Sequence, residues 1–468
     1  MKEFYRKHKR ALVFGACFAL LIYYFIWSIS KPYDYAPDEY QRFPICYYLF
    51  NHGALPSGWL PETRNELWGF SYAFYITWLP YILSSLCMKV MSFFTMSGKA
   101  ILVAARFPGV VASSITAFFV FKSLDKLLDS ERIKWLIFIT ISTTPQFAFL
   151  ASYLNCDALA LLGSSIICYS WVYIFKERLN IRISVLLAIG ISIVTLSYYN
   201  AYGWILLSII LFITRALPSP KEANLKNRKE IWICGLVVTI IVLGLCGYFP
   251  VRNALIYNGD ILGITSLKQS SEMYAIDTLK PSLRQTPYSS GVSFWEMVST
   301  TDWIESTVKS CIGYFGYMMF ECPGWLYNVY ASVDIAGYVF FIAETLILNI
   351  KKKKVQNTDS YFRFLLILAA AIPVCLSLHY SFYTDYQPQG RYIYPALPAA
   401  AIFLGFGYDY LYKLLKDKIK ISPKILNILI LILTICMIAV SLYAFKEVYL
   451  RSSWGSMEFF LYLYPIFN

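Results

Sequence analysis

The chain has 468 residues, of which 58% are hydrophobic, 18% are aromatic and only 15% are charged, and its mean hydropathy is +0.53. Soluble proteins carry about a quarter charged residues, whereas apolar runs of about twenty residues recur along this whole chain, so the composition excludes a soluble globular protein. The formal net charge of +13 does not indicate a nucleic-acid partner, because Lys and Arg gather in the cytoplasmic loops of membrane proteins. We therefore predict an all-α, polytopic membrane protein with a single membrane domain over residues 1–468.

The first apolar run covers residues 11–30 and follows five basic residues within residues 1–10. The run is long enough to cross a bilayer and has no small-residue cleavage site after it, so we expect an uncleaved anchor. The basic residues before it predict a cytoplasmic N-terminus. Later basic segments should also be cytoplasmic; they are 122–134, 176–182, 215–229, 351–354 with Arg363, and 413–424.

This assignment restricts the number of crossings between the first two basic regions. If residues 70–95 and 101–121 both crossed, every later basic loop would lie outside. Residues 70–95 are rich in aromatic side chains and contain Pro80 and Lys89, features that favour a helix lying in the membrane interface. We therefore predict eleven crossings: 11–30, 101–121, 134–153, 157–175, 183–199, 201–215, 231–250, 327–350, 362–380, 392–412 and 425–445. The outer face then carries the loops 31–98 and 251–326 and the tail 447–468.

Two adjacent carboxylates, Asp38 and Glu39, follow the first span on the predicted outer face. Such a pair suits general-base chemistry at a membrane surface. The alternative is a solvated turn, because Pro37 precedes the pair and Asp and Glu are common in turns beside proline.

Further polar residues lie at the outer ends of the predicted spans: Arg106, Asn155, Asp157, Arg252, Gln389, Arg391 and Tyr392. Ionisable residues near the membrane core are costly and are often functional. Each also has a structural alternative. Arg106 would reach the lipid headgroups, Asn155 and Asp157 would cap the next helix, and Arg252 would simply begin a loop. Arg391 best suits phosphate recognition, because the guanidinium fork matches phosphate geometry.

Together these residues fit glycosyl transfer from a lipid-linked donor. We expect Asp38 to act as the base with Glu39 assisting, and Arg391 and Arg252 to hold the donor phosphate. We also expect substrate-binding roles for Arg106, Asn155, Asp157, Gln389 and Tyr392. A carboxylate can deprotonate an acceptor hydroxyl, and arginines can stabilise a phosphate leaving group. The chain has eleven cysteines without a CxxC pair and only three histidines, which gives weak support to a transition-metal site. We therefore assign no metal ligand and no certain cofactor, and leave a divalent metal as an open possibility.

In order along the chain, several segments match a known family. They are Pro37-Asp38-Glu39, the aromatic stretch 72–81, Ala105-Arg106, Asn155 with Asp157, Arg252-Asn253 with Asn258-Gly259-Asp260, Ser293-Phe294-Trp295, and Gln389-Gly390-Arg391-Tyr392 with Pro395 and Pro398. With them the chain resembles the bacterial GT-C superfamily of integral membrane glycosyltransferases, and more closely the predicted membrane proteins of surface-polysaccharide gene clusters. Many relatives carry His shortly after the acidic pair, where this chain has Tyr40-Gln41-Arg42.

The resemblance implies a GT-C fold in a bacterial plasma membrane, with the active site on the outer face. It implies an inverting glycosyltransferase that uses a polyprenyl-monophosphate sugar as donor and a surface polysaccharide or glycolipid as acceptor. Asp38 would be the base with Glu39 beside it, and Arg391 would meet the donor phosphate. Two alternatives remain: a transporter or flippase of a lipid-linked sugar, and a polysaccharide polymerase or ligase.

Overall fold

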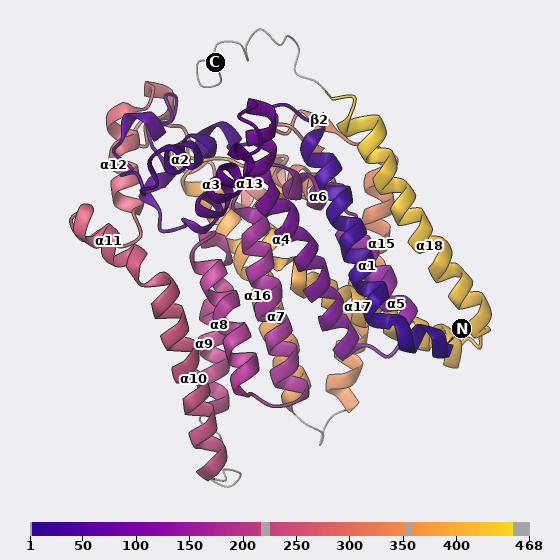
Figure 1. Cartoon of the computed structure of the whole chain (residues 1–468). Coiled ribbons are helices and arrows are strands. Elements are labelled where there is room, and N and C mark those ends of the chain that lie inside the picture. Colours follow the sequence, from indigo (N-terminus) through magenta and orange to yellow (C-terminus); the bar gives the residue numbers. More distant parts are fainter. Residues whose placement is uncertain (1, 217–224, 352–356, 453–468) are drawn as a thin grey trace.

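The computed structural model describes residues 2–216, 225–351 and 357–452. These residues are mainly helical, with one two-stranded antiparallel hairpin of β1 (Tyr314–Phe315) and β2 (Phe320–Glu321). Figure 1 shows a bundle of long helices with short helices and loops gathered at one end. We call this the loop end, and we call the opposite end, where α4 and α7 finish at Leu127 and Lys176, the basic end. Most of the predicted tail 447–468 lies outside the described residues.

Seven helices of the described chain are long and apolar enough to cross a membrane. They are α1 (Lys2–Ile29), α4 (Gly98–Leu127), α7 (Asp157–Lys176), α10 (Leu225–Cys246), α15 (Gly324–Lys351), α16 (Asn357–Tyr383) and α18 (Pro423–Tyr443). A bent pair, α5 (Glu131–Ser142) and α6 (Pro145–Ser152), makes an eighth span if the two helices are counted as one. All of these overlap predicted crossings, so the chain is an all-α, polytopic membrane protein.

The other three predicted crossings correspond to α8 (Ile181–Thr195), α9 (Gly203–Ala216) and α17 (Leu397–Asp417). Helices α8 and α9 have 15 and 14 residues, or roughly 22 Å of rise each, which is shorter than the roughly 30 Å hydrocarbon core. Length and composition alone thus support eight spans rather than the eleven predicted. Figure 1 nevertheless shows α8 and α9 running alongside α7 and α10 within the bundle.

The predicted crossing 134–153 is broken between α5 and α6 by 54°. Pro145 is the first residue of α6, where its missing N–H group is tolerated. The residue before a proline avoids the helical region, and Thr144 accordingly has ψ 127°. The proline therefore explains why one predicted span is two helices.

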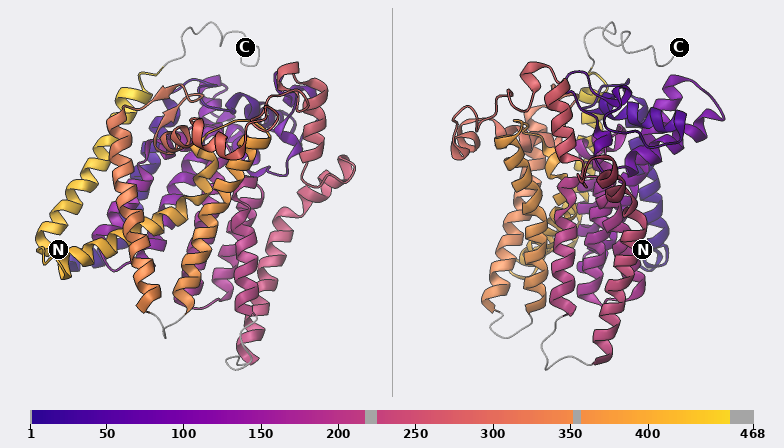
Figure 2. Two further views of the ribbon diagram at one scale, coloured as in Figure 1. Left: turned by 180° about the vertical axis from the view of Figure 1, so that it is seen from behind. Right: turned by 90° about the vertical axis from the view of Figure 1, so that its left-hand side faces the viewer.

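The two long loops pack against each other at the loop end (Figure 2). Their short helices are α2 (Glu39–His52), η1 (Pro61–Thr63), η2 (Tyr72–Phe74), α3 (Leu79–Ser92), α11 (Tyr248–Ile256), α12 (Ile264–Tyr274), η4 (Asp277–Leu279), α13 (Phe294–Thr300) and α14 (Trp303–Ile312). The Ser270 hydroxyl donates to the Gly69 carbonyl at 2.8 Å, and the Asn253 amide donates to the Phe74 carbonyl at 2.8 Å. These bonds join loop 251–326 to loop 31–98.

The predicted interfacial helix over residues 70–95 is shorter in the structure. Residues 72–74 form η2, and α3 begins only at Leu79, with Pro80 in its first turn. Just after α3, the side chains of Phe93 and Phe94 are 80% and 82% exposed. Apolar side chains this exposed suit contact with lipid, as expected for an interfacial segment.

A cluster of aromatic rings holds the hairpin over the end of α1. Trp27 is fully buried, and its ring centroid lies 4.3 Å from that of Tyr449 and 5.6 Å from that of Phe315 in β1. Paired rings add to the hydrophobic gain of burial. The cluster thereby fixes β1 beside residues 31–38, which follow α1.

Buried and half-buried ion pairs tie three helices together at the basic end. Lys9 of α1 lies 2.8 Å from Glu131 of α5, and Lys134 lies 2.8 Å from both Asp125 of α4 and Glu131. Several charges in one network are worth more than isolated surface pairs. Basic residues at this end therefore have a structural role as well as the topological role predicted from the sequence.

Helices α15 and α17 approach closely at a pair of glycines. A Cβ atom on Gly407 would lie 1.9 Å from the carbonyl oxygen of Gly337, which leaves no room for a methyl group. We expect Gly407→Ala to lower the free energy of unfolding by about 1–3 kcal/mol through overpacking, measured as thermal unfolding in detergent. Gly244→Ala in α10 is the control, because a Cβ there meets no atom of the described residues within 4 Å. Equal losses in both variants would contradict this packing.

Candidate active site

Asp38 lies immediately before α2 in the left-handed backbone region, with φ 63° and ψ 0°. Asp tolerates this region better than most residues. Its carbonyl oxygen accepts hydrogen bonds from the N–H groups of Gln41 and Arg42, both at 3.1 Å. The chain therefore turns sharply at Asp38, and adjacent residues 38 and 39 direct their carboxylates to different partners.

The Asp38 carboxylate lies between two guanidinium groups. Its Oδ2 atom lies 2.9 Å from Nη1 of Arg391 and 3.6 Å from Nη2 of Arg42. Both arginine side chains are about 7% exposed, whereas that of Asp38 is 18% exposed. We call these three residues the Asp38 cluster.

Arg391 belongs to the 3-10 segment η5 (Gly390–Ala396) that precedes α17. Its Nε atom donates to Oε1 of Gln389 at 2.6 Å, and its Nη2 atom donates to the hydroxyl of Tyr392 at 3.2 Å. A Cβ atom on Gly390 would lie 2.4 Å from the backbone nitrogen of Cys311. Close packing of η5 against α14 therefore positions the backbone that carries Arg391. The predicted residues Gln389, Arg391 and Tyr392 are joined to one another by hydrogen bonds.

The two arginines set the protonation of Asp38. Burial by itself raises the pKa of this carboxyl, but the charges and hydrogen bonds of Arg391 and Arg42 outweigh burial and hold it below its ordinary value. Asp38 is therefore ionised at neutral pH. Conversely, burial lowers the pKa of Arg391, yet the Asp38 charge keeps it well above the ordinary value.

Glu39 forms a separate, fully buried ion pair with Arg106 of α4. The Nε and Nη2 atoms of Arg106 donate to the two Glu39 oxygens at 2.7 Å and 2.6 Å. The same guanidinium donates to the carbonyls of Ser28, Lys31 and Pro32, each at 2.8 Å. Both side chains are at most 2% exposed, so neither is presented to a substrate in this structure.

The Glu39 carboxylate also organises the backbone around it. It accepts hydrogen bonds from the N–H groups of Asp34 at 3.1 Å and Leu154 at 3.0 Å. With Arg106, it joins the end of α1, the start of α2, α4 and the turn before α7. This geometry differs from the expectation that Glu39 assists the chemistry directly and that Arg106 meets either the donor or lipid headgroups.

Asn155 and Asp157 have different surroundings although they are two residues apart. The Asn155 side chain accepts from the N–H of Ala158 at 3.0 Å and donates to the carbonyls of Leu150 and Tyr153, so Asn155 caps α7, as its structural alternative predicted. Asp157 is 4% exposed, and its Oδ1 atom has no hydrogen-bond partner among the described residues. The positive charges of Arg391 and Arg42 act on this carboxyl, so Asp157 is electrostatically linked to the Asp38 cluster.

Arg252 is held at another place in the loop end. Its Nη2 atom donates to the carbonyls of Leu55 and Pro56 at 3.2 Å and 2.8 Å, and the guanidinium lies 5.4 Å from the ring centre of Trp78. These contacts connect α11 to loop 31–98. Arg252 is therefore not part of the Asp38 cluster, although it was predicted to hold the donor phosphate together with Arg391.

The β1–β2 hairpin covers the cluster from the other side. The Tyr317 hydroxyl in its turn donates to the carboxylate of Asp34, and a small cavity of ≈ 10 Å³ between hairpin and cluster is lined partly by Pro37, Met318 and Arg391. That volume is about the size of one water molecule. The hairpin therefore covers one side of the cluster, and little free space remains between the two, while the Asp38 side chain stays partly exposed.

Three residues of this region were not identified from the sequence. Arg42 completes the Asp38 cluster and lies 4.2 Å from the ring centre of Tyr72; the i,i+4 spacing from Asp38 was the signal that could have found it. Burial raises the pKa of Asp34 to about 7, and the hydrogen bond from Tyr317 opposes this only partly. No sequence signal identified Asp34 or Tyr317, because their pairing depends on the hairpin.

The sequence is compatible with a divalent metal at the site but assigns no ligand to it. Within the part of the chain that the structure describes, no group of three or more His, Cys, Asp or Glu could hold a metal ion. The carboxylates of Asp38 and Glu39 are each bound by arginine. This donor set does not fit a divalent cation.

Residues 60–400 match the family of predicted membrane proteins designated DUF2142. The chain belongs to the DUF2142 family. The matched range contains Arg106, Asp157, Arg252 and Arg391, whereas Asp38 and its neighbours precede it. No curated protein sequence matches this DUF2142 chain at a significant level.

Solved structures show which fold this DUF2142 protein has. The archaeal oligosaccharyltransferase AglB from Archaeoglobus fulgidus, in complex with an inhibitory peptide and a dolichol-phosphate, aligns over 97% of the chain with a TM-score of 0.56 and 12% identity. The same organism's enzyme in complex with Zn and sulfate aligns over 95% with a TM-score of 0.55 and 13% identity. ArnT from Cupriavidus metallidurans, bound to undecaprenyl phosphate, aligns over 95% with a TM-score of 0.51 and 11% identity.

The DUF2142 protein thus has the GT-C fold, as expected from the resemblance. It spans 58% and 54% of the two oligosaccharyltransferase chains and 73% of the ArnT chain. At this identity the similarity establishes the arrangement of helices. Activity and substrate have to be argued from the residues of the site.

Proposed function

We propose that this protein is an inverting glycosyltransferase that moves a sugar from a polyprenyl-monophosphate donor to a cell-surface polysaccharide or glycolipid. The observation that carries the proposal is the Asp38 cluster: a partly exposed carboxylate between two arginines, at the loop end of a GT-C fold. The structural neighbours are consistent with the donor, since two of them were solved with dolichol-phosphate or undecaprenyl phosphate. We place the protein in a bacterial plasma membrane, with a cytoplasmic N-terminus and the loop end outside.

The proposed reaction needs a base and a phosphate site. The acceptor hydroxyl loses its proton to Asp38 while its oxygen bonds to the anomeric carbon from the face opposite the phosphate. The bond between that carbon and the phosphate oxygen breaks, and polyprenyl monophosphate leaves with the electron pair. Arg391 stabilises the charge that grows on this leaving group, and attack from the opposite face inverts the anomeric centre.

The ion pair between Asp38 and Arg391 links donor binding to base strength. In the described structure Arg391 lowers the pKa of Asp38, which makes this carboxylate a weak base. A donor phosphate would compete with Asp38 for the guanidinium, and loss of that contact raises the pKa of Asp38. Asp38 would therefore become a stronger base when the donor is in place.

Glu39 and Arg106 have a positioning role in this proposal. Their buried ion pair fixes the backbone of Asp34 and Leu154 on both sides of the cluster. Asn155 caps α7 beside them, and Arg252 holds loop 31–98. No step of the proposed reaction uses a metal, because the carboxylates of Asp38 and Glu39 are both paired with arginine.

The proposed coupling predicts a change in pH dependence. Loss of the Arg391 charge removes the strongest interaction that lowers the pKa of Asp38, so this pKa should rise and the acid limb of the kcat/KM profile should move to higher pH in Arg391→Gln. Residual transfer activity measured across pH would show the shift, because this profile reports the ionisation of the free enzyme. Arg252→Gln is the control, since Arg252 does not contact Asp38. An unchanged acid limb in Arg391→Gln would refute the coupling.

A comparison of strains tests the biological role. Surface polysaccharide would be purified from the native host, from a gene deletion and from the deletion complemented with Asp38→Asn at matched protein level. We expect both mutants to lose one sugar substituent while the polysaccharide backbone stays intact. Loss in the deletion alone would favour a transporter or flippase, and loss of the whole polymer would favour a polymerase or ligase.

A further inference from the structure

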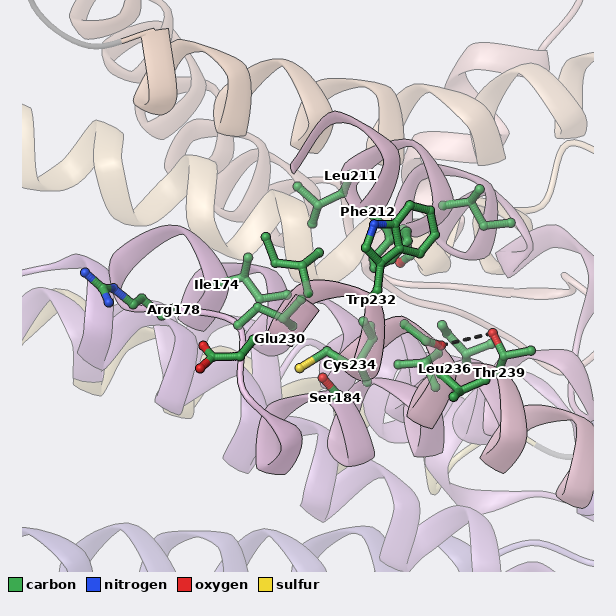
Figure 3. Close-up of a pocket in the computed structure, with 18 of the residues that line it drawn as sticks. Ile174, Arg178, Ser184, Leu211, Phe212, Glu230, Trp232, Cys234, Leu236 and Thr239 are labelled. Atoms are coloured by element: carbon green, nitrogen blue, oxygen red, sulfur yellow. Dashed lines mark hydrogen bonds between the residues drawn. The ribbon is translucent and has the colours of Figure 1, made fainter. Parts of the chain in front are cut away.

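A large cavity lies at the basic end, far along α7 from the Asp38 cluster. Its volume is ≈ 710 Å³, and it is bounded by α8, α9, α10 and the last turns of α7 (Figure 3). Pockets that hold small ligands have about 300–1,000 Å³. The cavity is therefore large enough for part of a lipid.

The walls of this cavity are mainly apolar. They include Leu187, Leu211, Phe212, Trp232 and Val238. Along α10 the lining residues run from 230 to 239, which corresponds to about 13 Å of helix rise. A hydrocarbon chain lying along α10 would therefore be covered by apolar side chains over much of the half of the bundle nearer the basic end.

Two charged side chains lie at one end of the cavity. Figure 3 shows Arg178 and Glu230 at this end, with the apolar side chains extending away from them. A third charged lining residue, Glu177, is already bound by Lys126. By contrast, neither Arg178 nor Glu230 has an ion-pair partner among the described residues. This end of the cavity therefore offers one cation and one anion.

This charge pattern selects among membrane lipids. A guanidinium binds phosphate through strong, charge-assisted hydrogen bonds. A carboxylate accepts hydrogen bonds from a primary ammonium, which has three N–H donors, whereas a quaternary ammonium has none. An anionic headgroup such as phosphatidylglycerol would satisfy Arg178 and be repelled by Glu230.

We infer that this cavity binds one zwitterionic phospholipid with a primary ammonium headgroup, phosphatidylethanolamine. Its phosphate contacts Arg178, its ammonium contacts Glu230, and an acyl chain fills the apolar cavity along α10. The site is at the opposite end of the bundle from the Asp38 cluster. This inference is therefore independent of the proposed glycosyltransferase function.

Native mass spectrometry of the purified full chain tests the site. Phosphatidylethanolamine, phosphatidylglycerol and phosphatidylcholine with identical acyl chains would each be titrated against wild type, Arg178→Gln and Glu230→Gln. We expect phosphatidylethanolamine to bind tightest, and each variant to lose about tenfold in its affinity, as expected for a lost charge-assisted hydrogen bond. Arg182→Gln is the matched control, because this exposed arginine lies at the same end but does not line the cavity.

A variant that fills the cavity separates headgroup recognition from surface charge. Ile209 lines the cavity and is 52% exposed, so Ile209→Trp should exclude the acyl chain while both charges remain. We expect it to abolish tight binding of phosphatidylethanolamine. Equal affinity for the three lipids, preference for phosphatidylglycerol, or unchanged binding in Ile209→Trp and both charge variants would each overturn the inference.

Discussion

Replacing Asp38 with asparagine is expected to lower the rate of sugar transfer by about 10²–10⁴-fold, the usual contribution of a positioned base. Asparagine keeps the size of the side chain and can still contact Arg391, but it cannot take a proton from the acceptor. The rate would be measured in membranes at equal protein level, with a polyprenyl-phosphate sugar as donor. A loss of rate with unchanged thermal stability would support Asp38 as the base.

The control for Asp38→Asn is Asp277→Asn. Asp277 is an exposed carboxylate in the other long loop, and among the described residues its ion-pair partner is Lys280. Its replacement should leave both transfer rate and stability unchanged. If Asp38→Asn retained the wild-type rate, Asp38 would not be the base and the proposed mechanism would be wrong.

Breaking the buried pair of Glu39 and Arg106 is expected to have the largest effect on stability. Removing one partner leaves the other charge buried and unpaired, which typically costs about 3–5 kcal/mol. Replacing Arg106 would also remove the hydrogen-bond donor of three backbone carbonyls. We therefore expect Arg106→Gln and Glu39→Gln each to lower the melting temperature in detergent and to reduce the amount of folded protein.

A double variant distinguishes the ion pair from local packing. In Glu39→Gln with Arg106→Gln, neither charge is left unpaired, so the double variant should be more stable than the sum of the single effects predicts. A strictly additive loss would show that the two side chains do not interact as the structure indicates. A full loss of activity with wild-type stability would instead give Glu39 a direct part in the reaction.

The division of roles between Asp38 and Glu39 could not be predicted from the sequence. Adjacent acidic residues look alike in a linear motif, and only the left-handed backbone at Asp38 sends the two carboxylates to different partners. The partner of Asp38 is 353 residues away in the chain. The predicted topology placed Asp38 and Arg391 at one face of the membrane, but their contact depends on how η5 packs against α14.

The polytopic helical fold could be predicted from the sequence, and the break between α5 and α6 had a sequence signal. The recurring apolar runs and the positions of basic residues predicted the polytopic helical fold, and Pro145 carried the signal for the break between α5 and α6. Short helices such as α8 were harder, because an apolar run does not show where a helix begins or ends. The partners of Arg252 could not be predicted, since this cation was expected at the site but binds loop carbonyls instead.

Sugar transfer by the purified protein in detergent, without vesicles, would decide whether this protein is the proposed glycosyltransferase. Donor and acceptor would be mixed with wild type or Asp38→Asn, and both glycosylated acceptor and released polyprenyl monophosphate would be measured. If Asp38 is the base of a transferase, wild type should give equal amounts of the two products, and Asp38→Asn should lose about 10²–10⁴-fold in rate. Absence of transfer by folded wild-type protein across a panel of polyprenyl-monophosphate sugars, together with movement of lipid-linked sugar across vesicles, would contradict the proposed function.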